Sequence, residues 1–362
     1  MQPTRVRSRP RASTPILVAL AALGLLLAGT PIPAAAAPPA PRVQARTGVL
    51  MDAASGAVLW QRHAHEPVLV ASTTKVLTAL VASDAYPPGK VFTVPQAAEE
   101  VDGTRLGYRT GMRVSRHGLL TTLLLVSAND AAETLAAAYP HGGRAGFLRA
   151  MQTEAAALGC TDSTWRDPSG LDAPGHRASA ADLAVLGRAL LARPELAALV
   201  GSRSVRYRWP GGHVQWLTNH NHFVSQGRDP GALGIKTGYT VDARSTIMAA
   251  QRRGGRVLVA VALGSDDMYG DVRSMFAYGF GVRPRAGGEV LGVRPRSATG
   301  GAASTASSPR VGRLAPNNAA PLLRRLARRL LTTPLPLAAA AGVGLFALGL
   351  VALVGQRRLG RG

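Results

Sequence analysis

Residues 68–82 read VLVASTTKVLTALVA, where Ser72-Thr73-Thr74-Lys75 stands directly before the apolar helical run Val76–Ala82. Ser72 and Lys75 are three residues apart, so the start of a helix would place both side chains on one face. A serine hydroxyl is a poor nucleophile unless a neighbour takes its proton, which a lysine does only if burial or a nearby cation lowers its pKa. Taken alone, these four residues are more typical of a helix cap followed by a surface lysine.

Two further short motifs follow along the chain. Ser127-Ala128-Asn129 lies between the helical runs Leu119–Val126 and Asp130–Ala138, and alone it is typical of a turn. Lys236-Thr237-Gly238 lies on the strand-like run Leu233–Tyr239, where a lysine is also a common edge-strand residue. Arginine accounts for 39 of the 42 basic residues, yet two of the three lysines fall in these motifs, which indicates chemistry that needs an amine.

The remaining patterns predict an α+β fold. Val49–Asp52 and Ala57–Trp60 form a hairpin pattern at the start, and Ser245–Gln251 and Val257–Leu263 are strand-like runs joined by Gly254-Gly255 near the end. Helical patterns lie between them. One of these begins at a capping box formed by Ser179 and Asp182 and runs through Leu191. A last helical pattern, Asp267–Phe280, follows the final strand. Because strands come first and last, we expect an antiparallel sheet with helices on both faces.

The three motifs, in this order, resemble those of the penicillin-binding DD-peptidases, the serine acyl-transfer superfamily that includes the β-lactamases. The similarity is to low-molecular-mass D-alanyl-D-alanine carboxypeptidases, and it extends to the blocks VLVASTTKVLTALVA, LLTTLLLVSANDAAETLA, DPSGLDAPGHRASAADLAVLGRAL and GALGIKTGYTVDARSTIMAA. These blocks span nearly all of a catalytic domain over residues 45–282. The resemblance implies a five-stranded antiparallel sheet and no metal or other cofactor.

The resemblance also implies a role for each motif residue. Ser72 would be the acylated nucleophile, Lys75 its base, and Ser127 a proton relay toward the leaving amine. Three side chains would bind the substrate: Asn129 its amide, Thr237 its terminal carboxylate, and Lys236 through its positive charge. The backbone N–H groups of Tyr239 and Ser72 would form the oxyanion hole.

The chain departs from the family pattern in three places. Ala128 stands where the family commonly has glycine, and Ser169-Gly170-Leu171 stands where it often has His-Gly-Leu. Neither change removes a reacting group, so they affect substrate detail more than activity. The small β-rich domain of many relatives is also expected to be missing, because a low-complexity stretch follows directly after residue 282.

Both ends of the chain carry targeting patterns. A cleaved signal peptide is predicted over residues 1–36, with an uncleaved anchor as the alternative. The pattern consists of the basic stretch Arg5 to Arg11, the apolar run Ile16–Gly29 and the small-residue cleavage site Ala34-x-Ala36. Residues 283–333 predict a flexible basic stalk ending in a juxtamembrane helix. The uncharged run 335–355 predicts one transmembrane helix. Because the signal peptide would export the catalytic domain, we expect this domain on the extracytoplasmic side of the cell membrane and the tail, 356–362, in the cytoplasm.

The net charge of +22 suggests nucleic acid at first sight. Residues 1–41 and 283–362 together carry +16 of it, however, and we find no nucleic-acid-binding motif, so we expect no such partner. His63-Ala64-His65 and His220-Asn221-His222 lack the partners of a metal motif and are interpreted as loop or surface histidines. Glu99-Glu100 is interpreted as a solvated loop, and Cys160 as a small core residue.

Together these patterns predict a membrane-anchored serine carboxypeptidase that removes the terminal D-Ala from peptidoglycan stem pentapeptides through an acyl-enzyme. β-Lactam antibiotics would be covalent inhibitors. One alternative is a β-lactamase of the same fold, although no E-x-x-L-N segment follows the SAN motif. The other is a catalytically inactive wall-binding scaffold, against which the intact Ser72, Lys75, Ser127 and Lys236 argue.

Overall fold

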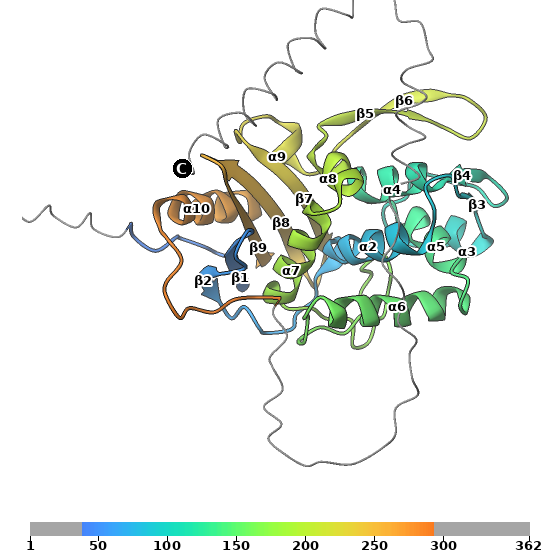
Figure 1. Cartoon of the computed structure of the whole chain (residues 1–362). Coiled ribbons are helices and arrows are strands. Elements are labelled where there is room, and N and C mark those ends of the chain that lie inside the picture. The colour runs from blue at the N-terminus through green and yellow to red at the C-terminus, as the bar shows by residue number, and fades with distance from the viewer. Residues whose placement is uncertain (1–37, 293–362) are drawn as a thin grey trace, which may run out of the picture. The chain divides into compact units, whose positions relative to one another are not determined.

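A five-stranded antiparallel sheet runs through the residues that the computed structural model describes, 38–292 (Figure 1). The strand order is β2-β1-β9-β8-β7. The hairpin of β1 (Thr47–Asp52) and β2 (Val58–Arg62) therefore lies beside β9 (Arg256–Ser265), β8 (Arg244–Arg253) and β7 (Ala232–Thr240), which come some 200 residues later. This order confirms the predicted α+β fold and antiparallel sheet.

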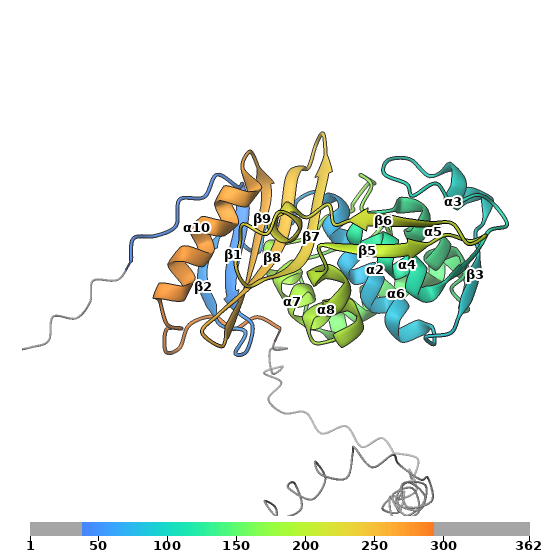
Figure 2. The ribbon, with the colours of Figure 1, turned by 90° about the horizontal axis from the view of Figure 1, so that it is seen from above.

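Helices cover both faces of the sheet, because its central strands are apolar on both sides. On β8, Ile247 and Ala249 pack into one core, whereas Met248 and Ala250 pack into the other. The first core is covered by α10 (Met268–Gly281), which Figure 2 shows along one side of the sheet. The second core is shared with α7 (Ala180–Leu191), on the other side.

The helical part lies between β2 and β7 in sequence. Its predicted helices are confirmed as α2 (Lys75–Ala85), α4 (Arg116–Leu125), α5 (Asn129–Ala137) and α7. A 3₁₀ turn, η1 (Ala71–Thr74), precedes α2 and carries Ser72. The hydroxyl of Ser179 caps α7 by accepting from the N–H of Asp182. The capping box is half formed, since the Asp182 carboxylate accepts instead from Thr161, Asp162 and Ser163.

Several elements were not predicted. The largest is α6 (Gly143–Ala157), which packs beside α2 and α5. The others are short: α3 (Gln96–Glu100), α8 (Pro194–Gly201), α9 (His222–Ser225), and the strand pairs β3 (Val91–Thr93) with β4 (Arg113–Ser115) and β5 (Ser204–Arg208) with β6 (Val214–Thr218). The interpretation of Glu99-Glu100 as a loop was wrong, because both residues end α3, where Glu99 accepts hydrogen bonds from Thr110.

The predicted targeting segments lie outside the described residues. These are the signal peptide, 1–36, most of the stalk, 283–333, the transmembrane run, 335–355, and the tail, 356–362. Within residues 38–292, none of the helices has the length and apolar character needed to cross a membrane.

Candidate active site

The Ser72 hydroxyl and the Lys75 amine lie side by side where η1 passes into α2. Lys75 Nζ is 2.9 Å from Ser72 Oγ and donates a hydrogen bond to the Ser169 carbonyl at 2.5 Å. Ser72 is half-buried, whereas Lys75 is completely buried. The structure therefore rules out a surface lysine, because a lysine is buried in this way only where specific contacts compensate for its desolvation.

The charge of Lys75 is set by its surroundings. Burial and the positive charge of Lys236 lower the pKa of Lys75 well below its ordinary value, while the carboxylates of Asp167, Asp130 and Glu133 raise it. A lowered pKa favours the neutral amine, which can accept a proton from a hydroxyl at hydrogen-bond distance. The pair can thus act as nucleophile and base.

The edge strand β7 lies against the nucleophile. A side chain at Gly238 would bring its Cβ within 2.7 Å of the Ser72 backbone nitrogen, so glycine alone permits this approach. Lys236 is buried on the same strand, donates to the Thr237 carbonyl at 2.7 Å, and has its pKa lowered to about 7 by burial. Thr237 is half-buried and Tyr239 is exposed, so the strand offers polar groups beside Ser72.

The Ser127–Asn129 segment connects α4 to α5, as predicted. Ser127 is buried and has a backbone φ of 63°, a conformation that is unusual for serine and often found at functional sites. Asn129 donates through Nδ2 to the Asp102 carbonyl at 2.6 Å, and its buried Oδ1 has no hydrogen-bond partner within residues 38–292. That free acceptor can take an N–H from a ligand. Ala128 has ordinary extended dihedrals, so the alanine that replaces the family's glycine fits without strain.

The loop 167–171 was not predicted as part of the site. Gly170 there has φ +87°, and a Cβ at this position would lie 2.0 Å from the Ala71 carbonyl oxygen. Only the backbone carbonyl of Ser169 reaches Lys75, so this contact does not require the family's histidine side chain. An Asp-Pro-Ser-Gly sequence is a turn signal that could have indicated the loop, though not its partner.

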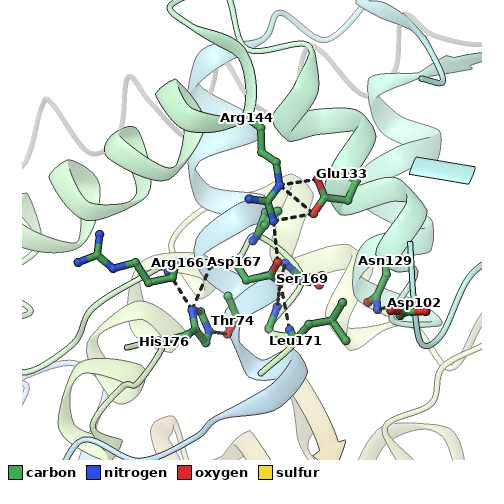
Figure 3. A network of polar contacts seen from close by, with 12 residues as sticks. Thr74, Asp102, Asn129, Glu133, Arg144, Arg166, Asp167, Ser169, Leu171 and His176 are labelled. Carbon is green, nitrogen blue, oxygen red and sulfur yellow. Dashed lines mark hydrogen bonds and ion pairs between the residues drawn. The ribbon is translucent and has the colours of Figure 1, made fainter. Parts of the chain in front are cut away.

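A buried histidine joins this loop to the nucleophile's segment (Figure 3). Nδ1 of His176 accepts from the N–H groups of Arg166 and Asp167, so Nε2 carries the hydrogen and donates to Thr74 Oγ1 at 2.9 Å. Burial lowers the pKa of His176 to about 4, which keeps the ring neutral at pH 7. His176 thus connects the two segments without adding charge near Lys75.

The other sequence candidates differ in their distance from the site. Burial, and then the positive charge of Lys236, lower the pKa of His220, so this histidine lies near the site lysine. His65 is half-exposed and contacts Asp162 and Glu289 at 2.7 Å each. The described residues contain no group of three side chains suited to a metal ion. Cys160 is buried, in agreement with its interpretation as a core residue.

The fold and the site are suited to a serine acyl-transfer protein, because a buried lysine lies beside a half-buried serine hydroxyl. A family model described as D-alanyl-D-alanine carboxypeptidase matches residues 34–267. The chain is 37% identical over 259 residues to D-alanyl-D-alanine carboxypeptidase DacB2 of Mycobacterium tuberculosis, an alignment that covers 68% of this chain and 86% of DacB2. The chain therefore belongs to the D-alanyl-D-alanine carboxypeptidase family.

Solved structures agree with the fold. A crystal structure of a D-alanyl-D-alanine carboxypeptidase from Mycobacterium tuberculosis H37Rv superposes with a TM-score of 0.65 at 35% identity, over 72% of this chain and 98% of that one. The DD-transpeptidase of Streptomyces K15 superposes with a TM-score of 0.63 at 24% identity, over 68% of this chain and all of that one. The second likeness supports the fold alone.

Proposed function

We propose that the protein is a serine carboxypeptidase that removes the terminal D-Ala from peptidoglycan stem pentapeptides through an acyl-enzyme on Ser72. The observation that carries the proposal is the 2.9 Å contact between Ser72 Oγ and the buried, pKa-lowered amine of Lys75. Membership of the D-alanyl-D-alanine carboxypeptidase family supplies the substrate class.

The proposed acylation assigns one step to each group. Neutral Lys75 takes the Ser72 proton as Oγ attacks the carbonyl of the penultimate D-Ala. The backbone N–H groups of Ser72 and Tyr239 then stabilise the oxyanion. The proton that Lys75 has taken then passes through the Ser127 hydroxyl to the departing D-Ala amine, which restores the neutral lysine, and water later hydrolyses the ester to free Ser72.

The remaining roles concern binding of the substrate. Asn129 Oδ1, which lacks a partner within residues 38–292, accepts the amide N–H of the bound peptide. Thr237 binds the terminal carboxylate, and the charge of Lys236 attracts it while helping to keep Lys75 neutral. The same contacts would orient a β-lactam, whose strained amide and carboxylate occupy equivalent positions.

The β-lactamase alternative is less well supported. Rapid release of a penicilloyl ester needs a carboxylate that activates water. The three carboxylates that act on Lys75 are already engaged, Glu133 and Asp167 by Arg144 and Asp130 by backbone N–H groups. The Lys75 amine donates a hydrogen bond to the Ser169 carbonyl, and a carbonyl cannot take a proton from water.

Benzylpenicillin should add its mass covalently to the purified protein, and mass spectrometry of peptides should place the adduct on Ser72. Ser72→Ala should remove the adduct, because within residues 38–292 no other hydroxyl is hydrogen-bonded to the Lys75 amine. Equal labelling of the mutant would contradict the assignment. Fast multiple turnover of penicillin would favour the lactamase.

We further propose that residues 1–36 direct export and that 335–355 anchor the domain on the outer side of the membrane. The support is the sequence pattern alone: a basic stretch and short apolar run at one end and 21 uncharged residues at the other. A chain cut after Ala320 should leave the membrane fraction and keep its penicillin labelling. Retention of the cut chain in salt-washed membranes would show that the N-terminal run is the anchor.

A further inference from the structure

An arginine outside the three motifs joins two carboxylates next to the active site. Arg144 on α6 donates to Glu133 on α5, with its Nε 2.9 Å from Glu133 Oε2, and to Asp167 Oδ2 at 2.8 Å through Nη2 (Figure 3). Both carboxylates are buried, whereas the arginine side chain is 44% exposed. A buried carboxylate is costly without such a partner.

The second carboxylate oxygen of Asp167 shapes the loop that reaches Lys75. Asp167 Oδ1 accepts from the N–H groups of Ser169 and Gly170 at 2.8 Å each and from the Ser169 hydroxyl at 2.6 Å. These bonds fix the loop so that the Ser169 carbonyl accepts from Lys75 Nζ. Although burial raises the pKa of Asp167, the hydroxyl and N–H of Ser169 hold it below its ordinary value.

The orientation of the Lys75 amine matters because a neutral amine has a single lone pair. When one N–H is held by the Ser169 carbonyl, the lone pair can turn toward the hydroxyl of Ser72, 2.9 Å away. Loss of the carbonyl would leave the amine free to rotate.

Charges face Lys75 from every side. Lys236 on β7 disfavours its protonation, whereas Asp130 and Glu133 on α5 and Asp167 in the loop favour it. Arg144 pairs with two of these three carboxylates, and Asp130 accepts from the backbone N–H groups of Gly107 and Tyr108. Without Arg144, two buried negative charges would act on Lys75 unopposed.

We propose that Arg144 is a positioning residue for acylation. It holds the Ser169 carbonyl in place to accept from Lys75, and its positive charge offsets the negative charges of Glu133 and Asp167 near the Lys75 amine. The inference rests on the proposed function of Ser72 and Lys75, but Arg144 itself touches neither residue. Its contribution should appear in the pH dependence of acylation.

The test is the acylation rate of the full chain with a fluorescent penicillin, measured from pH 5 to pH 10. Arg144→Met should shift the acid limb of the profile upward by about one pH unit, and so lower the rate on that limb about tenfold. Glu133→Gln should shift the limb downward, because it removes one of the carboxylates that favour protonation of Lys75 and leaves the pair of Arg144 and Asp167 electrically neutral. The double variant should fall between the two.

Arg149→Met is the matched control, because Arg149 lies on the same helix, is exposed and forms no ion pair within residues 38–292. Its profile should superpose on that of the unchanged protein. An acid limb that stays unshifted in Arg144→Met, whatever the loss of rate on the plateau, would overturn the proposal. Should Arg144→Met alone not fold, the acid limb of the double variant should lie above that of Glu133→Gln, and coincident limbs in those two variants would overturn the proposal equally. Absence of labelling in the unchanged protein would instead count against the proposed function.

Discussion

Lys75→Arg should lose nearly all acylation by penicillin, at least ~10²-fold, the low end of what general base catalysis contributes. A guanidinium stays protonated, so it cannot take the Ser72 proton. Its planar fork is also wider than the amine, which is completely buried between Ser72 and the Ser169 carbonyl. The measurement is the rate of labelling with one fluorescent penicillin, at the pH where the unchanged protein reacts fastest.

Lys236→Arg is the control for this experiment. Lys236 is also buried, but its proposed role is to supply a positive charge near Lys75 and the substrate carboxylate, and an arginine can supply the same charge. Lys236→Arg should therefore keep measurable acylation, and Lys236→Ala should keep much less. If Lys75→Arg reacts as well as Lys236→Arg, the base is another group, and Ser127 or a water molecule would be the first candidates.

Gly170→Ala should reduce acylation at least about tenfold and lower stability by about 1–3 kcal/mol, the cost of a residue held in a sparsely populated backbone region. Its φ of +87° is unfavourable for alanine, and the new Cβ would lie 2.0 Å from the Ala71 carbonyl oxygen. The loop or η1 must move, and either movement separates Ser169 from Lys75.

Gly175→Ala provides the comparison. Gly175 has a similar φ of +76°, but a Cβ there would meet only the Arg166 side chain, at 4.0 Å. This variant should show the conformational cost in thermal unfolding and keep most of its acylation rate. An equal loss of rate in both variants would mean that the close packing of Gly170 against Ala71 does not matter for the site.

The parts of the site that the sequence predicts are those carried by short local motifs. Ser72 and Lys75 are three residues apart on one turn, so their proximity follows from local geometry, as it does for Ser127 and Asn129. Glycine at position 238 predicts a close backbone approach, and the structure identifies the partner as the nitrogen of Ser72.

The rest of the site depends on tertiary packing. Arg144, Glu133 and Asp167 come from two helices and a loop, and no spacing in the sequence indicates that they meet. Helix α6, which carries Arg144, was itself not predicted, although Phe147, Met151 and Ala155 recur at every fourth residue on its buried side. The contact between Ser169 and Lys75 involves a backbone carbonyl, so residue identity carries little information about it.

The most direct measurement of the central claim is the mass of the products from a purified stem pentapeptide ending in D-Ala-D-Ala. The protein should release one D-Ala and leave a tetrapeptide, and water labelled with ¹⁸O should place the label in the new terminal carboxyl group. Ser72→Ala should release none. An unchanged pentapeptide, together with rapid hydrolysis of penicillin, would contradict the account, as would equal release of D-Ala by the Ser72→Ala variant.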